Sequence, residues 1–493
     1  SFDDVVLLLN CANTLEVGFV RDYPQIKSVL WVGFPGESGN LAAAAILSGA
    51  VNPSGRTVDI YPADFTRDPA FVNFGDYRYS NISRQNASGD GCFVQYEEGI
   101  YVGYRYFETF AKDRVLYPFG FGLSYTTFDM EVAGFESDGE TVKEVVIVKN
   151  TGDVPGKQVV QVYAEAPQGK LGKAARSLCA FKKTAELQPG ESEEVTLTVP
   201  VEKMASYDAY DANHNGFAGY ELDAGDYIFT VRHDAHTVDD AEKATLTCTL
   251  PANVQYPTDS VSGSEVGNKF TGSDAIDGVS LDGSDSEQNI TYLTRADFAG
   301  TCPKACTPSR AMTDNVKALN LYTADMANGY INEADEAITT GAKNGLKIED
   351  NGKTTELGYQ LGADFNDPQW DALLDQLTVN EMENLFINAY GGLAELKSVG
   401  KARSKDADGP AQIGGFTGMG AGTGFPSSST LAQTWNADLA LQEGRTIGTQ
   451  ALQNGYTGWY APATNMHRST FNGRNYEYYS EDSLLSGVIC GNT

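Results

Sequence analysis

A ten-residue stretch near the end of the chain combines a cation, aromatic rings and carboxylates at short spacing. Residues 473–482 read Gly-Arg-Asn-Tyr-Glu-Tyr-Tyr-Ser-Glu-Asp. The guanidinium of Arg474 is a planar set of hydrogen-bond donors that suits hydroxyl oxygens, and tyrosine rings offer flat apolar faces. Such a set suits a polar, ring-shaped ligand such as a sugar. The structural alternative is a helix start, with Ser480 as N-cap and Glu481 and Asp482 at the favourable end of the helix dipole.

Four further motifs precede this stretch in a defined order. They are Asp408-Gly409-Pro410, then Gly-Phe-Pro-Ser-Ser-Ser at 424–429, Thr-Trp-Asn at 434–436, and Ala-Pro-Ala-Thr-Asn-Met-His-Arg at 461–468. In this order and spacing they resemble the first part of the (β/α)8 barrel of glycoside hydrolase family 3, the family of β-glucosidases and β-xylosidases. Several motifs in one order are more specific than any one of them. The resemblance therefore favours the sugar-site interpretation of residues 473–482.

The composition limits the classes of partner. The chain has 493 residues, 41% of them hydrophobic, which is enough for about three domains. Its net charge is 35 − 66 = −31. This charge repels phosphate backbones and anionic headgroups, so nucleic acid and membrane surfaces are poor candidate partners and neither is expected, whereas a neutral substrate is not penalised. No apolar run reaches the ~20 residues that span a bilayer.

The cysteine pattern favours a cytoplasmic protein without a metal. Seven cysteines are dispersed over a large chain, which argues against a disulfide scaffold. Cys302 and Cys306 are four residues apart, but no Cys or His pair lies near them in sequence to complete a zinc site. We therefore expect neither a metal nor a cofactor. The chain opens at Ser1 without Met, so we expect the true N-terminus to lie upstream.

Residues 1–128 predict the second part of an α/β layer. Apolar runs at 4–10 and 28–34 are typical of parallel strands buried on both faces, and an Ala/Leu-rich helix is expected between 39 and 49. The motifs from 31 to 128, including the aromatic run at 96–107, resemble the end of the α/β sandwich domain of family 3.

Two adjacent acids in the aromatic run have two interpretations. Glu97 or Glu98 could be a catalytic acid, but a carboxylate near Arg105 is more often one half of a structural ion pair. We therefore interpret them as structural.

Residues 129–250 change to an alternating pattern that predicts a fibronectin type III-like β-sandwich. Strands are expected at 142–148, 158–163 and 194–199, separated by Gly- and Asn-containing turns. Residues 211–216 imitate the start of a calcium loop, but Leu222 stands where the closing Glu belongs, so an Asx-rich turn is predicted.

The remaining residues predict a linker and then part of a barrel. Residues 251–310 are rich in Ser, Asp and Gly and are expected to form a long connection. Residues 311–493 are assigned to the first part of the (β/α)8 barrel. A helix over 367–377 should bury one face, formed by Trp370, Leu373, Leu374 and Leu377, and Thr378 should cap the next helix in a capping box with Glu381.

The domain order and the chain length bear on where catalysis resides. The usual family 3 order is barrel, α/β sandwich, fibronectin-like domain, so this chain resembles the members with inverted order. A complete barrel needs ~250 residues. The family nucleophile is an Asp in a Ser-Asp-Trp context, and neither Ser-Asp-Trp nor the family's Lys-His pair occurs in the sequence. The family's acid/base Glu would precede Ser1. We therefore expect an internal piece of an enzyme whose catalytic carboxylates lie outside the chain, and whose partner is the rest of the same enzyme.

The resemblance implies three substrate-binding residues. Asp408 would accept hydrogen bonds from outer sugar hydroxyls, and Arg474 would donate to a hydroxyl. His467 could also reach the sugar, or it could brace a loop. Glu477 and Asp482 are interpreted as a partner of Arg474 and a helix start. Trp435 and Trp459 are interpreted as core residues rather than stacking platforms.

The predicted activity is that of a retaining β-glycosidase, in the first place a β-glucosidase that releases terminal glucose. One departure bears on sugar preference, because Gly414 stands where the family has a sugar-binding Arg. A β-xylosidase or α-arabinofuranosidase of the same family, or a non-catalytic carbohydrate-binding relative, remains an alternative. A homo-oligomer is left open.

Overall fold

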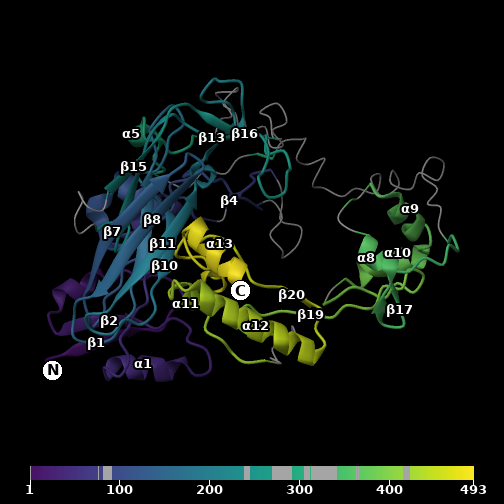
Figure 1. Ribbon diagram of the computed structural model, residues 1–493, viewed down its shortest axis with the longest axis horizontal. Coiled ribbons are helices and arrows are strands. Elements are labelled where there is room, and N and C mark those ends of the chain that lie inside the picture. The colour runs from purple at the N-terminus through teal and green to yellow at the C-terminus, as the bar shows by residue number, and fades with distance from the viewer. Residues whose placement is uncertain are drawn as a thin grey trace. The chain divides into compact units, whose positions relative to one another are not determined.

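The computed structural model describes residues 2–75, 77–81, 92–237, 245–268, 291–304, 311–312, 341–361, 364, 366–389, 391–414 and 422–493. The chain forms two compact units (Figure 1). The first contains residues 1–320, 426–441 and 464–493, and the second contains residues 321–425 and 442–463. The first unit therefore joins segments from both ends of the chain.

The chain begins with a parallel strand pair, as the apolar runs predict. Strands β1 (Val5–Leu9) and β2 (Ile26–Trp31) pair in parallel, and helix α1 (Gly39–Leu47) follows. The prediction that β1 is buried on both faces was wrong, because the side chains of Val6 and Leu8 are 46% and 45% exposed. Alternate residues of β1 face the other way and pack with Val17 and Tyr61, so only one face of this two-stranded sheet is covered.

Short elements complete the N-terminal segment. They are β3 (Tyr61–Pro62), α2 (Pro69–Val72), β4 (Tyr77–Arg78), β5 (Cys92–Phe93), α3 (Tyr104–Phe110) and β6 (Val115–Tyr117). Strand β3 pairs with β6, and β4 pairs with β5.

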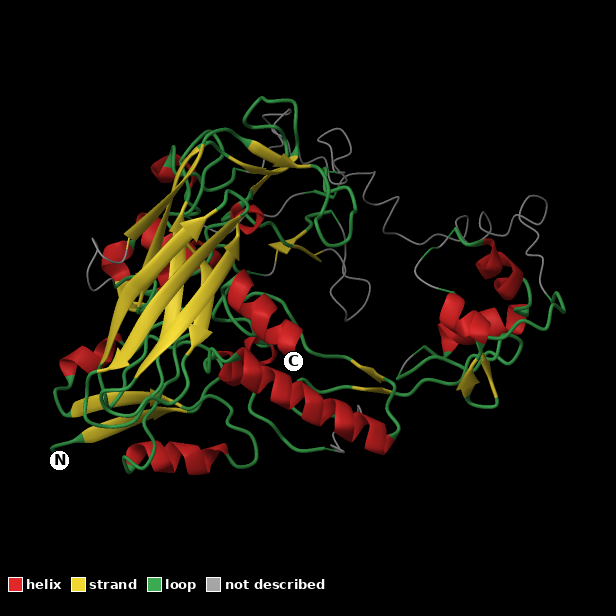
Figure 2. Ribbon diagram, in the orientation of Figure 1, coloured by secondary structure: helices red, strands yellow, loops and turns green. Residues whose placement is uncertain are grey.

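Two antiparallel sheets form the predicted β-sandwich (Figure 2). One has the order β10-β9-β14-β15 and the other β11-β8-β7. Their bounds are β7 Phe128–Ser137, β8 Thr141–Asn150, β9 Val159–Glu165, β10 Ser177–Lys183, β11 Ser192–Pro200, β14 Gly225–Arg232 and β15 Thr245–Leu250. Alternating valines of β8 and β11 fill the space between the sheets. The three strands predicted from alternation are thus confirmed.

Three short strands form a separate small sheet. They are β12 (Ser206–Asp208), β13 (Gly219–Leu222) and β16 (Val254–Tyr256). The loop between β12 and β13 is the predicted Asx-rich turn, because the carboxylate of Asp211 accepts hydrogen bonds from the backbone N–H groups of Asn215 and Gly216 at 2.7 and 3.0 Å.

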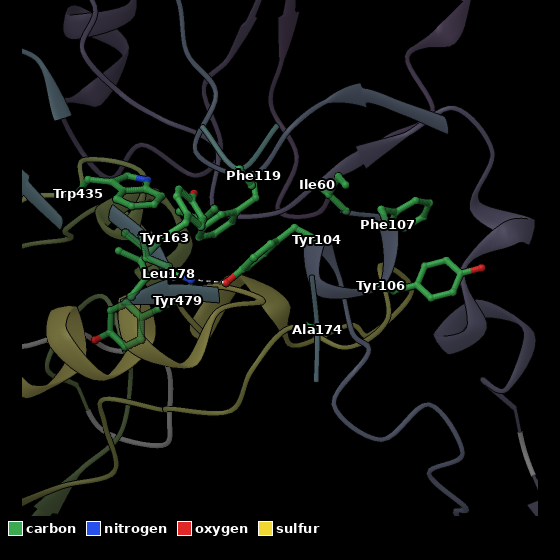
Figure 3. Close-up of a cluster of buried hydrophobic side chains, with 14 of the residues drawn as sticks. Ile60, Tyr104, Tyr106, Phe107, Phe119, Tyr163, Ala174, Leu178, Trp435 and Tyr479 are labelled. Atoms are coloured by element: carbon green, nitrogen blue, oxygen red, sulfur yellow. Dashed lines mark hydrogen bonds between the residues drawn. The ribbon is translucent and has the colours of Figure 1, made fainter. Parts of the chain in front are cut away.

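Strand β9 is buried on both faces, and this joins the sandwich to the rest of the unit. Val160 and Val162 point into the sandwich core, whereas Val159 and Tyr163 belong to a second core. Figure 3 shows this second core, in which Tyr104, Phe119, Tyr163 and Trp435 come together from segments far apart in sequence. The Tyr104 and Phe119 rings stack with centroids 4.5 Å apart. Aromatic packing therefore holds C-terminal residues against the N-terminal segment.

The C-terminal part of the first unit is helical. It contains α11 (Ser428–Ala432), the start of α12 (Ala437–Asn454) and α13 (Ser483–Asn492), and the short helix α5 (Phe298–Thr301) precedes them in the 1–320 segment. Leu431, Leu485 and Ile489 bury their side chains in the second core. Trp435 is fully buried there, as predicted.

The second unit contains β17 (Glu349–Asp350), β18 (Lys353–Thr354), α8 (Glu356–Gln360), α9 (Pro368–Leu374), α10 (Val379–Ile387), β19 (Asp406–Ala407) and β20 (Gly458–Trp459). Strands β19 and β20 pair in parallel. No closed barrel is found in the described residues, so the assignment of 311–493 to the first part of a (β/α)8 barrel is not confirmed.

The helix signals of the second unit are largely confirmed. Asp367 caps α9, and Thr378 and Glu381 form the predicted capping box of α10. Leu373 and Leu377 are buried, but Leu374 is 50% exposed, so its assignment to the buried face was wrong. Helix α9 ends at Leu374, and the turn after it brings Leu377 to the core.

The described cysteines are not joined in disulfides, and the described helices do not fit a membrane span. Cys11, Cys179, Cys248, Cys302 and Cys490 form no disulfide with one another or with any other described cysteine. Cys306 lies outside the described residues, as do residues 269–290 and the rest of 305–310 in the predicted linker. None of the helices in the described part of the chain is both long and apolar enough to cross a bilayer.

Candidate substrate-binding site

Helix α13 begins directly after the acidic end of the 473–482 stretch. Its N-cap is Asp482, whose Oδ1 accepts a hydrogen bond from Leu485 N at 2.9 Å. The prediction that Ser480 is the N-cap was wrong. The Ser480 hydroxyl instead donates to the carbonyl oxygen of Val58 at 2.7 Å and accepts from Asp482 N at 3.0 Å. Ser480 lies three residues before the first helical residue, so its side chain serves a long-range contact rather than the helix end.

Asp482 also holds the helix start against α3. Its Oδ2 accepts hydrogen bonds from Arg105 Nη2 at 2.7 Å and from the Tyr104 hydroxyl at 2.8 Å. The Asp482 side chain is fully buried. A buried carboxylate with a cation and two further donors is well compensated, so this pair is structural, as predicted for Asp482.

His467 is the centre of a second buried contact. Its Nδ1 lies 2.7 Å from Asp59 Oδ1, and its Nε2 lies 2.8 Å from the carbonyl oxygen of Asn475. Both neighbours accept hydrogen bonds, so the arrangement favours the doubly protonated imidazolium. Burial opposes the charge on His467, but the Asp59 carboxylate and the accepting carbonyls outweigh burial and raise its pKa.

Glu481 makes a third link between the C-terminal segment and the N-terminal segment. Its two carboxylate oxygens accept hydrogen bonds from the backbone N–H groups of Tyr104 at 2.8 Å and Ile60 at 3.1 Å. Burial, together with the charge of Asp59, raises the pKa of Glu481 well above its usual value. Gly103 has φ +57°, and a Cβ on it would overlap the Glu481 carboxylate, so only glycine fits.

Arg468 makes a bidentate ion pair with Glu98. Arg468 Nε contacts Oε1 of Glu98, and Nη2 lies 3.2 Å from Oε2. Glu98 is therefore a structural acid, as interpreted, but its cation is Arg468 and not Arg105, which binds Asp482. The partner was wrong because the pair joins residues 370 positions apart.

These contacts surround a space too small for a sugar. Asp59, Asp68, His467 and Glu481 line a cavity of about 30 Å³. This volume is close to that of a single water molecule. In the described ranges, no three His, Cys, Asp or Glu side chains come together as metal ligands would. The role that remains for the buried contacts of His467, Glu481 and Asp482 is to hold the 464–482 segment in place.

Arg474 is one of the exposed residues of that segment. Its side chain is 69% exposed and forms an ion pair with Glu477, as predicted. Its backbone N–H donates to Asn472 Oδ1 at 3.3 Å. Asn475 follows Arg474 in the chain, and its carbonyl oxygen contacts the buried His467. This contact anchors the turn that carries Arg474.

Asp408 belongs to the second unit, at the end of β19. Its backbone exchanges hydrogen bonds with Gly414, and its Oδ1 accepts from Gly409 N at 2.7 Å. Trp459 is partly buried beside it and donates from Nε1 to the Gly409 carbonyl oxygen at 2.9 Å. The turn after β19 is thus held by its own backbone and by the next strand. The placement of Asp408 as a sugar ligand stays a prediction.

Sequence reasoning missed Asp59 as a partner of His467 and Glu481 as a long-range anchor. Asp59 lies between Val58 and Ile60, both of which are buried in the second core. An acid between two apolar residues of a core is an available signal, but it does not name a partner 408 residues away.

Comparisons with known families and proteins agree on one family. Residues 1–125 match the glycosyl hydrolase family 3 C-terminal domain, 158–235 the fibronectin type III-like domain, and 410–492 the glycosyl hydrolase family 3 N-terminal domain. β-Glucosidase A of Butyrivibrio fibrisolvens is 34% identical over 99% of this chain and 56% of its own length. A β-glucosidase of Ruminococcus albus is 32% identical over 99% of this chain and 46% of its own length.

A solved structure supports the same relationship. The crystal structure of a β-glucosidase from Paenibacillus barengoltzii is 29% identical, with a TM-score of 0.72 over 100% of this chain and 50% of that chain. The chain spans about half the length of these relatives. It carries a C-terminal-domain segment first, a fibronectin type III-like domain second and an N-terminal-domain segment last, and it belongs to glycosyl hydrolase family 3 in inverted domain order.

Proposed function

We propose that the enzyme to which this chain contributes is a retaining β-glucosidase that releases terminal glucose from oligosaccharides or glucosides. The observation that carries the proposal is that two proteins named as β-glucosidases match 99% of the chain at 34% and 32% identity. In a retaining mechanism one carboxylate attacks the anomeric carbon, and a second protonates the leaving oxygen and then activates water.

Arg474 and Asp408 are proposed to bind the glucose ring. The exposed guanidinium of Arg474, on a turn anchored by buried contacts, supports this role, because a fixed donor set can recognise hydroxyls without first becoming ordered. Asp408 has oxygen lone pairs left for sugar hydroxyls after accepting from Gly409. For His467, the engagement of both ring nitrogens favours the bracing role over direct contact with the sugar.

The two catalytic carboxylates are proposed to lie outside these residues, in the rest of the same enzyme. The absence of Ser-Asp-Trp and Lys-His from the sequence supports this. The parallel pair β19–β20, with α11 and α12 between them in sequence, supports a barrel that begins within 311–493. The boundaries 1–128, 129–250 and 251–310 for the preceding parts remain proposals, as does a cytoplasmic location.

The sugar preference is the open part of this proposal. Gly414, in place of a sugar-binding Arg, removes one hydroxyl contact, and a β-xylosidase or α-arabinofuranosidase would need one fewer such contact. A non-catalytic carbohydrate-binding relative is the remaining alternative.

Hydrolysis assays on the complete protein separate these functions. We expect nitrophenyl β-glucoside to be cleaved faster than nitrophenyl β-xyloside or α-arabinofuranoside. A preference for either pentoside would replace the glucosidase assignment, and cleavage of none of them would favour the binding protein. Mass spectrometry of the intact sample would show whether the polypeptide extends beyond residues 1–493 or has a companion chain.

A further inference from the structure

Asn472 and Gly473 form an Asn-Gly pair directly before Arg474. In such a pair the backbone nitrogen of the glycine can attack the side-chain carbonyl carbon of the asparagine, because glycine has no side chain to hinder the approach. The product is a five-membered imide, which water reopens to an acid. An Asn-Gly pair is therefore a point at which a protein can modify itself, provided that the nitrogen and the carbonyl carbon are free to meet.

The glycine nitrogen is free in this pair and held in most of the others. A nitrogen that donates a hydrogen bond must give it up before it can attack. This applies to the pairs at 215–216, 344–345 and 454–455, whose glycine N–H groups donate hydrogen bonds of 3.0, 2.9 and 3.2 Å. The N–H of Gly473 donates to none of the residues that the structure describes, and the same holds for the pair at 351–352.

The side chain of Asn472 is folded back over this free nitrogen. Its Oδ1 accepts the backbone N–H of Arg474 at 3.3 Å. A side-chain oxygen that reaches the second N–H after its own residue brings its carbonyl carbon close to the first one, which is that of Gly473. The hydrogen bond also favours attack, because negative charge develops on Oδ1 as the nitrogen adds to the carbon. Among the Asn-Gly pairs in the described ranges, this one alone combines such a carbonyl with a free glycine nitrogen.

The space around Gly473 is open. Gly473 is exposed, and a Cβ built on it would meet no atom within 4 Å. Water therefore reaches the pair, and the imide ring has room to form.

We propose that Asn472 undergoes spontaneous deamidation and that this modification disables the turn that carries Arg474. The Gly473 nitrogen forms a bond to Cγ of Asn472 and the bond from Cγ to Nδ2 breaks, so that Nδ2 leaves as ammonia with the proton of the Gly473 N–H. Water then adds to one of the two imide carbonyl carbons. Cleavage of the bond from Cγ to the nitrogen gives aspartate, and cleavage of the backbone C–N bond gives isoaspartate, whose main chain runs through Cβ and Cγ.

Both products remove a contact that shapes the turn. Nδ2 of Asn472 donates to Oδ1 of Asn475 at 3.0 Å, and Nδ2 of Asn475 donates to the carbonyl oxygen of Ser469 at 2.9 Å. After deamidation two oxygens face each other, and Asn475 cannot turn its amide without leaving the Ser469 carbonyl unpaired. Asn475 is 3% exposed and is also the residue that contacts His467. The modification therefore acts on the anchor of Arg474, and its effect on activity rests on the proposed function of Arg474 as a sugar ligand.

Mass spectrometry of the complete enzyme, incubated at mildly alkaline pH, tests the modification. We expect the tryptic peptide 469–474 to gain the mass difference between an amide and an acid several-fold faster than the peptides that contain Asn215, Asn344 and Asn454. Gly473→Ala should suppress this gain, because its Cβ hinders the attack, and the open space around the position lets the variant fold. Conversion of Asn472 no faster than that of the other three would overturn the proposal.

Hydrolysis of nitrophenyl β-glucoside by the same samples tests the consequence. Activity should fall in proportion to the fraction of chains converted, and Asn472→Asp should begin with kcat/KM about tenfold below the wild type. Gly473→Ala is the control for other causes of inactivation and should keep its starting activity through the incubation. Full activity of converted wild-type enzyme would overturn the effect on the Arg474 turn.

The two readouts separate this proposal from the proposed function. If fresh wild-type enzyme cleaves no glucoside, the glucosidase function fails, whereas mass spectrometry still decides whether Asn472 is modified. Hydrogen exchange of peptides from 464–482 should then be faster in converted chains, because the turn has lost a contact. Unchanged exchange would overturn the effect on the turn.

Discussion

The carboxylate of Glu144 is buried in the β-sandwich core without a partner, and its removal should stabilise the domain at neutral and alkaline pH. Glu144 is 1% exposed and follows Val142 in the inward-facing row of β8. Neither carboxylate oxygen accepts or donates a hydrogen bond among the described residues. Burial raises the pKa of Glu144 from 4.5 to about 7. The perturbation is Glu144→Gln, which keeps the shape of the side chain and cannot ionise.

The sign and size follow from proton linkage. Between pH 4.5 and 7 the folded state holds a proton on Glu144 that the unfolded state has released, so stability falls as pH rises through this window. A shift from 4.5 to about 7, at 1.36 kcal/mol per unit, amounts to roughly 3 kcal/mol. Below pH 4.5 the wild type and Glu144→Gln should therefore be about equally stable, and at pH 8 the variant should be more stable by roughly that amount.

Hydrogen–deuterium exchange of peptides covering β8 and β11 measures the difference locally. At each pH the exchange rate of Glu144→Gln is compared with that of the wild type, so the intrinsic effect of pH on exchange cancels. At pH 8 the variant should exchange more than about a hundredfold more slowly, and near pH 4.5 the rates should converge. The control is Glu194→Gln on β11, where the replaced carboxylate is exposed. Parallel pH profiles for the wild type and Glu144→Gln would refute the reasoning, because they would mean that the carboxylate is solvated or paired.

Three further outcomes test the C-terminal segment. Gly103→Ala should lower the unfolding free energy by ~1–3 kcal/mol more than the control Gly99→Ala. Both positions have φ +57°, but only at Gly103 would the added Cβ displace Glu481 from its backbone donors. Denaturant titration measures the difference, and equal losses for the two variants would contradict this prediction. Arg474→Ala should reduce kcat/KM of the complete enzyme for glucosides ~10–100-fold, because a donor to a sugar hydroxyl is lost, and an unchanged kcat/KM would remove Arg474 from the site. His467 has a raised pKa, so its stabilising charge is fully present below pH 6.5 and is lost as pH rises through the raised value. His467→Gln should abolish that part of the pH dependence of the unfolding free energy, and a variant profile that parallels the wild type would contradict the charged form.

Local patterns predicted those parts of the fold whose cause is local. The strands of the sandwich follow from alternating valines, and the capping box of Thr378 and Glu381 follows from a three-residue spacing. The pattern was less reliable where neighbours compete for one role. Ser480 and Asp482 are both good N-caps, and the choice between them depended on Val58, which takes the Ser480 hydroxyl.

Burial of the first strands shows a different limit. An apolar run indicates that a strand can be buried on both faces, but the outcome depends on what packs against it. In β1 only one face is covered, whereas in β9 both faces are, because β9 contributes to two cores at once. Neither strand carries that information in its own residues.

The order of its motifs alone determined the family of this protein and the identity of Arg474 and Asp408 as candidate sugar ligands, because side-chain chemistry and spacing can be read directly from the sequence. Only the tertiary structure decided how the Arg474 turn is held. Its anchors join Asp59 to His467 and Glu98 to Arg468 across 408 and 370 residues. Such contacts depend on how the chain folds back on itself, and once the aromatic core has brought the two segments together, burial selects the partner for each charge.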